Sequence, residues 1–167
     1  DMGDWIGGEV LARSLEGTLG FEIVERVITN GSIYMDLVQL SAGQLALLGQ
    51  PDARVTGTNA PSREALASSL LQFVSPPRRA AAAPHMDAMV EGMLHDDGFR
   101  LLPRTVRYIE ERRKHEGRWT GAIERHPSPL TIVWGAQDPI ARVAMAHRLA
   151  AARPDASLRI LEDLSHF

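Results

Sequence analysis

The amino-acid sequence predicts an α/β fold, with helices on both faces of a parallel sheet and an all-helical block inserted between its strands. The apolar run at 130–134 lies between Pro129 and Gly135 and indicates a strand buried on both faces. Strand-like and helical segments alternate on either side of it, as in parallel sheets. Residues 32–127 show helical spacing and no convincing strand pattern, which predicts the helical insertion.

The composition is that of an ordinary globular domain. The 167 residues include 44% hydrophobic and 23% charged residues, which favours a packed core. The formal charge of -3 excludes the strong basic excess of a dedicated nucleic-acid-binding protein. The lack of cysteine excludes a disulfide scaffold and thiolate catalysis. Only one of the 18 basic residues is a lysine and alanine is abundant, which points to a GC-rich bacterial gene.

Neither a membrane protein nor a secreted one is indicated. No apolar run approaches the roughly 18 residues of a membrane-spanning helix, and no signal peptide begins the sequence. The compartment stays open, with the cytoplasm as the expectation. Both ends of the sequence look like the middle of a longer one, so we expect an internal fragment that is poorly soluble and inactive alone.

At the two ends of the chain, the pattern predicts the elements of the sheet. Apolar residues on one face predict a helix over 3–16, and β-branched residues predict a strand over 22–29, closed by the turn signal Asn30-Gly31. After the strand at 130–134, we expect a helix over 139–152 and a strand over 157–161.

In the middle block, helices are expected to alternate with loops. Ser62 can cap one helix, and the proline-flanked segment 75–84 is interpreted as a linker or loop. Residues 86–94 carry a methionine-rich apolar stripe, and a third helical stretch runs over 101–113. The basic segment 104–118 is interpreted as a solvated helix face.

Three residues form a candidate catalytic set, because each lies on a loop that follows a predicted strand or begins a helix. Asp1 directly precedes the first helix, whose positive end favours an ionised, nucleophilic carboxylate. Asp138 follows the buried strand and His166 follows the last one. Carboxylate, carboxylate and histidine in this order match a nucleophile, an orienting acid and a base.

Two other carboxylates compete for these roles. Asp4 is a rival nucleophile, but Ile6 stands two positions further on, where a sharp strand-to-helix turn needs a small residue. Asp163 is a rival partner for the histidine, and it suits a turn better. The six histidines include no pair four residues apart, so a metal site is not expected.

Seven short motifs are distributed along the chain. They are Asp1-Met-Gly-Asp4, Thr29-Asn-Gly-Ser-Ile33, His95-Asp-Asp-Gly98, Val106-Arg-Tyr-Ile-Glu-Glu-Arg-Arg-Lys114, Arg118-Trp-Thr-Gly-Ala-Ile123, Trp134-Gly-Ala-Gln-Asp-Pro139 and Ser165-His166. Together they resemble the mesoderm-specific-transcript branch of the α/β hydrolases, which is similar to epoxide hydrolases and haloalkane dehalogenases. The likeness spans nearly the whole chain and is thin between 34 and 93.

The resemblance implies the C-terminal part of an α/β-hydrolase fold. Residues 1–33 and 119–167 correspond to the hydrolase core, and 34–118 to a helical cap that roofs the active site. Asp1 aligns with the nucleophile, Asp138 with the acid and His166 with the base. The strands and the loop that supply a second oxyanion donor would lie upstream of the sequence.

The resemblance also implies residues that bind the substrate. The backbone N–H of Met2 would help to form the oxyanion hole. Tyr108 falls where the family places a cap tyrosine that hydrogen-bonds an epoxide oxygen, and Tyr34 is a weaker second candidate. Dehalogenases carry tryptophan directly after the nucleophile, so Met2 at that position counts against dehalogenation.

The implied activity is epoxide hydrolysis through an alkyl-enzyme ester, which a water activated by His166 then hydrolyses. The expected partners are a small apolar electrophile and water, without nucleic acid or metal, and the implied mechanism needs no cofactor. The alternatives are a haloalkane dehalogenase, an ester hydrolase, and a hydrolase-fold protein that binds a ligand without turnover.

Overall fold

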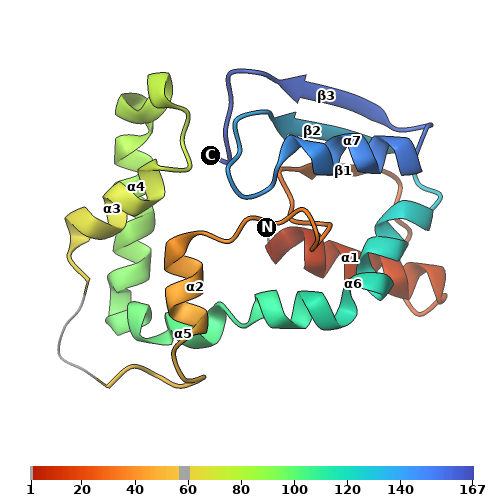
Figure 1. Ribbon diagram of the computed structural model, residues 1–167. Coiled ribbons are helices and arrows are strands. Elements are labelled where there is room, and N and C mark those ends of the chain that lie inside the picture. The colour runs from red at the N-terminus through yellow and green to blue at the C-terminus, as the bar shows by residue number, and fades with distance from the viewer. Residues whose placement is uncertain (1, 57–60) are drawn as a thin grey trace. The chain divides into compact units, whose positions relative to one another are not determined.

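The computed structural model describes residues 2–56 and 61–167 and contains two compact units (Figure 1). The core unit comprises residues 1–39 and 110–166, and the helical unit comprises residues 40–109 with Phe167. The cap expected over 34–118 is therefore longer at both ends than the helical unit.

The core unit is built on a three-stranded parallel sheet in the order β1-β2-β3. The strands are β1 (Arg26–Thr29), β2 (Leu130–Gly135) and β3 (Ser157–Leu161). The predictions of β2 and β3 are confirmed. β1 begins four residues later than predicted because, among the described residues, it pairs with β2 alone, and Arg26 already pairs with Leu130, the first residue of that strand.

Three helices of the core unit pack with the sheet in one hydrophobic core. They are α1 (Met2–Leu15), the part of α6 (Tyr108–Arg125) from residue 110 onward, and α7 (Val143–Ala152). α1 and α6 approach closely, since a Cβ on Gly8 would lie 2.9 Å from the Cβ of Trp119. Trp134 and Ile132 on β2 are fully buried in this core.

The helical unit contains only helices, turns and loops within residues 40–56 and 61–109, as predicted. Its helices are α2 (Ala42–Leu48), α3 (Arg63–Leu71), η1 (Pro76–Arg78), α4 (Arg79–Leu94), η2 (His95–Leu101) and α5 (Leu102–Thr105). The predicted cap of α3 is confirmed, because the Ser62 side chain accepts a hydrogen bond from the N–H of Ala65.

The interpretation of 75–84 as a linker is wrong. This segment forms η1 and the start of α4, which continues through Pro84. Pro84 costs the helix one backbone hydrogen bond. The high helix propensity of the four preceding alanines and the burial of Met86 and Val90 outweigh that cost.

Candidate active site

Two of the three residues in the candidate catalytic set meet in the core unit. Asp138 follows β2 and His166 follows β3, and adjacent parallel strands present their carboxyl ends at the same edge of the sheet. The Nδ1 atom of His166 lies 2.7 Å from Oδ2 of Asp138. Both side chains are almost fully buried, with 9% and 0% exposure respectively.

The loop after β2 is tied to the loop after β3 by backbone hydrogen bonds. Ala136 donates to the carbonyl of Leu161, and Gln137 donates to the carbonyl of Leu164. Gly135 permits this approach, since a Cβ there would lie 2.3 Å from the carbonyl oxygen of Ser165. A glycine at the end of β2 is therefore required to hold His166 beside Asp138.

The carboxylate of Asp138 is surrounded by hydrogen-bond donors. Oδ1 accepts from the backbone N–H groups of Ile140 and Ala141, at 2.7 and 2.9 Å. Oδ2 accepts from His166 and from the amide of Asn30, the latter at 2.8 Å. With four donors, the buried carboxylate can remain ionised.

The balance of burial and hydrogen bonding sets the ionisation of Asp138. Burial raises the pKa of the carboxyl, but the hydrogen bond and charge of His166 and the donors from Asn30 and Ile140 outweigh burial, so the pKa is lowered. An ionised Asp138 holds the proton of His166 on Nδ1. The other ring nitrogen, Nε2, can then act as a base.

Asn30 belongs to this cluster, a role that neither the turn signal Asn30-Gly31 nor the motif Thr29-Asn-Gly-Ser-Ile33 predicted. It follows β1 with a positive φ of 29°, and it is 9% exposed. Its Oδ1 accepts from the N–H of Gly135 at 2.8 Å. The signal in the sequence was an amide side chain directly after β1, the strand that neighbours β2, which Asp138 follows.

The predicted nucleophile, Asp1, lies outside the described residues. Met2 is the first residue of α1, and its backbone N–H is one of the four at a helix start without an intrahelical acceptor. The rival Asp4 is part of α1 and packs against Gly31, where a Cβ would lie 2.3 Å from its Cγ. The rival Asp163 is exposed in a turn, as the sequence suggested.

The two tyrosines lie in different units and in different surroundings. Tyr34 belongs to the core unit, is 1% exposed, and donates its hydroxyl proton to Glu124 at 2.7 Å. These are the contacts of a packing residue. Tyr108 is partly exposed in the helical unit, and its hydroxyl oxygen accepts from the Gln44 amide at 3.5 Å.

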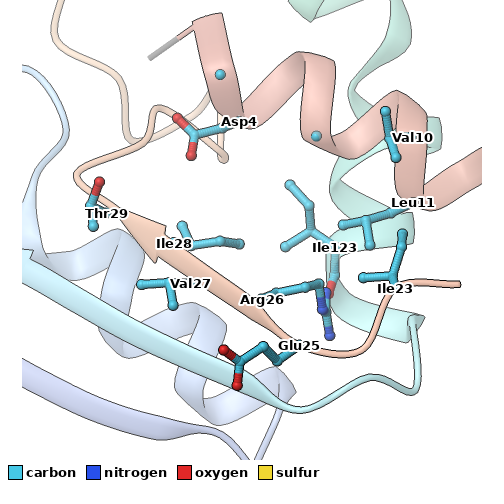
Figure 2. Close-up of a pocket in the computed structure, with 12 residues that line it drawn as sticks. Asp4, Val10, Leu11, Ile23, Glu25, Arg26, Val27, Ile28, Thr29 and Ile123 are labelled. Carbon is cyan, nitrogen blue, oxygen red and sulfur yellow. The ribbon is translucent and has the colours of Figure 1, made fainter.

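A pocket of about 510 Å³ lies in the core unit beside α1 and the outer edge of β1. Figure 2 shows Asp4 and Thr29 near one end of this pocket and the aliphatic side chains of Val10, Leu11 and Ile123 farther along α1 and α6. Neither Asp138 nor His166 lines it. The pocket follows the edge of β1 that pairs with no other strand among the described residues.

Metal binding and membrane crossing can be examined for the described part of the chain. Within it, no three histidine or acidic side chains gather in a group that could hold a metal ion. No helix there combines the length and hydrophobicity needed to span a bilayer.

Comparisons of sequence identify relatives with a hydrolase name. No family model matches the chain. Two relatives, both named "Putative hydrolase LipZ" and both from Mycobacterium tuberculosis (strains CDC 1551 / Oshkosh and ATCC 25618 / H37Rv), are 33% identical over 170 residues. The match covers 100% of this chain and 57% of each relative, so the chain spans little more than half of their length.

Comparisons of structure establish the fold. The enol-lactonase from Burkholderia xenovorans LB400 matches with a TM-score of 0.66 and 20% identity, over 99% of this chain and 56% of the enzyme. The meta-cleavage product hydrolase CumD from Pseudomonas fluorescens IP01 matches with a TM-score of 0.62 and 17% identity, over 96% and 54%. The chain has the fold of the C-terminal part of an α/β hydrolase, as predicted.

Proposed function

We propose that this chain is the catalytic part of a hydrolase that uses Asp1 as nucleophile and the Asp138–His166 pair to activate water. The observation that carries the proposal is the 2.7 Å contact between Nδ1 of His166 and Asp138. The hydrolase name of the 33% identical relatives supports the general reaction class. The choice of an epoxide as substrate rests on the resemblance of the motifs.

The first step forms an alkyl-enzyme ester. A carboxylate oxygen of Asp1 attacks an epoxide carbon, the carbon–oxygen bond of the ring breaks, and the released oxygen takes a proton. Tyr108 is the proposed donor to this oxygen. It belongs to the helical unit, and its role rests on the resemblance rather than on a measured distance.

The second step hydrolyses that ester. Nε2 of His166 takes a proton from water, and the resulting hydroxide attacks the ester carbonyl. The backbone N–H of Met2 would stabilise the negative oxygen of the intermediate. Collapse of the intermediate regenerates the Asp1 carboxylate, and the leaving oxygen takes the remaining proton of the attacking water, which releases the diol. The proton on His166 then returns to Tyr108 through solvent. Asp138 stabilises the imidazolium that forms on the way.

The test is to trap the ester in a His166→Gln variant of the full-length protein. Without its base the second step stops, so an incubated epoxide should add its entire mass to the protein, at a peptide containing Asp1. His147→Gln is the matched control, because His147 is exposed on α7 in the same unit. The control should hydrolyse the substrate and accumulate no adduct.

The form of the adduct separates the alternatives. A haloalkane would add its alkyl group without the halogen, and an ester would add an acyl group, so intact mass spectrometry distinguishes dehalogenation and ester hydrolysis from epoxide opening. If panels of all three substrates give no adduct and no turnover, the proposal is overturned in favour of a binding protein.

A further inference from the structure

We infer that Asn30 is a positioning residue that holds the carboxylate of Asp138 in the orientation that His166 requires. The residue lies 108 positions before Asp138 in the chain, yet its side chain reaches across from the end of β1 to the loop after β2. The inference rests on the proposed function for its catalytic consequence, but its structural part can be measured without a substrate.

The side-chain amide of Asn30 makes three hydrogen bonds, and their chemistry fixes its orientation. Oδ1 accepts from the N–H of Gly135 at 2.8 Å, while Nδ2 donates to the Gly135 carbonyl at 3.3 Å and to Oδ2 of Asp138 at 2.8 Å. A rotated amide would place its oxygen against a carboxylate and a carbonyl. Asparagine supplies the required acceptor and donors at once.

These bonds extend the contact between β1 and β2 beyond the paired backbone. The last pair in register is Thr29 with Val133, and the Asn30 side chain then binds both backbone polar groups of Gly135. The strand end that leads into the Asp138 loop is therefore anchored to the residue that follows β1. This anchoring limits the rotation of the carboxylate.

The second donor on Oδ2 also determines where His166 can bind. Oδ2 receives Nδ2 of Asn30 and Nδ1 of His166, at 2.8 and 2.7 Å. When Asn30 occupies one side of this oxygen, the imidazole is directed to the other side. Aspartate at position 30 has a similar shape, but it would place a second carboxylate against Asp138 and remove the donor.

The backbone of Asn30 allows a variant that removes only the side chain. Its φ of 29° lies in the left-handed region, which glycine adopts without strain. Asn30→Gly therefore deletes the three hydrogen bonds with little change in backbone energy. Asp96→Gly is the matched control, since Asp96 also has a positive φ, of 48°, and an exposed side chain in the helical unit.

The experiment is an NMR comparison of the full-length parent protein with its Asn30→Gly, Asn30→Asp and Asp96→Gly variants. In both Asn30 variants, the carboxyl carbon of Asp138 should titrate at higher pH than in the parent, because one donor is lost. The Nδ1 proton of His166 should also shift or broaden, because the imidazole is held less firmly. The Asp96→Gly spectra should match the parent at both groups.

Activity gives the second readout. With a substrate that traps on Asp1, both Asn30 variants should hydrolyse the ester roughly tenfold to a hundredfold more slowly, with little change in KM. Unchanged Asp138 and His166 signals in a folded Asn30→Gly protein would overturn the inference. If Asn30→Gly does not fold, the Asp138 and His166 signals of Asn30→Asp provide the same test. Altered signals in a protein that turns over no substrate would support the inference and count against the proposed function.

Discussion

The core unit and the helical unit are stabilised in different ways. Among the described residues, every buried polar or charged residue except Ser75 belongs to the core unit. In the helical unit, α2 and α3 bury no residue, and polar side chains form caps, exposed ion pairs and hydrogen bonds to loop carbonyls, such as that of Arg100 to Val55. Buried polar groups thus concentrate where atoms must be held in fixed geometry.

A buried arginine pair illustrates how the core unit is held. Arg26 and Arg153 both donate to the backbone carbonyls of His126 and Ser128, at 2.6–3.4 Å. Burial and the neighbouring Arg153 charge lower the pKa of Arg26 to about 10. The two like charges stay close because both guanidinium groups donate hydrogen bonds to the carbonyl oxygens of the turn that leads into β2.

Glycine substitutions should give the largest difference between the two units. Gly135→Ala places a methyl group 2.3 Å from the Ser165 carbonyl oxygen, so the segment before His166 must move. We expect a loss of about 2–4 kcal/mol in the free energy of unfolding, together with loss of the Asp138–His166 hydrogen bond. Urea denaturation and the His166 Nδ1 proton signal measure the two effects.

Gly92→Ala is the matched change in the helical unit. Gly92 lies in α4, and a Cβ added there would have no neighbouring atom within 4 Å, so alanine should stabilise the helix by roughly 0.5–1 kcal/mol. Equal destabilisation by both substitutions would contradict the difference that we describe between the units.

Substitution of Tyr108 tests whether the helical unit contributes to the catalytic reaction as well as to stability. In Tyr108→Phe, loss of the hydroxyl should slow ester formation by roughly tenfold to a hundredfold without slowing hydrolysis of the trapped ester. Single-turnover kinetics separate the two steps. Tyr34→Phe is the control, because the Tyr34 hydroxyl binds Glu124 inside the core unit. The opposite ranking of the two variants would assign the donor role to Tyr34.

Substitution of His126 should have a smaller, pH-dependent effect on the stability of the core unit. Its Nδ1 accepts from the N–H of Ser128, and its Nε2 lies 3.0 Å from the hydroxyl oxygen of Ser14. Burial and the charges of Arg26 and Arg153 lower its pKa. The unfolded chain therefore binds a proton at His126 more readily than the folded chain does. The stability that neutral, buried His126 contributes is present above about pH 6.5 and is lost as pH falls through the pKa of the folded state.

The measurement is the melting temperature of the parent and of His126→Asn between about pH 7.5 and pH 5. The asparagine oxygen can accept the Ser128 N–H and does not titrate, so the variant should lose less stability on acidification. His95→Asn is the control, as His95 is 79% exposed in the helical unit. Identical pH profiles for the parent and His126→Asn would contradict this assignment.

Sequence patterns were most informative where a residue's surroundings follow from its near neighbours. The apolar run at 130–134, the alternation at 157–161 and the Ser62 cap all depend on local spacing, and all were confirmed. The prediction of a loop over 75–84 was wrong because the prolines of this segment favour a loop while its alanines favour a helix. Only the packing of Met86 and Val90 decides between the two.

The sequence by itself determined the α/β fold and the placement of Asp138 and His166 after successive strands, because strand periodicity is local and parallel strands end at one edge. Tertiary structure decided that Asn30 joins them and that β1 starts at Arg26. Those features depend on which strands become neighbours across about a hundred residues of intervening chain. Hydrogen bonds between such distant segments have no local pattern, so only the folded chain defines them.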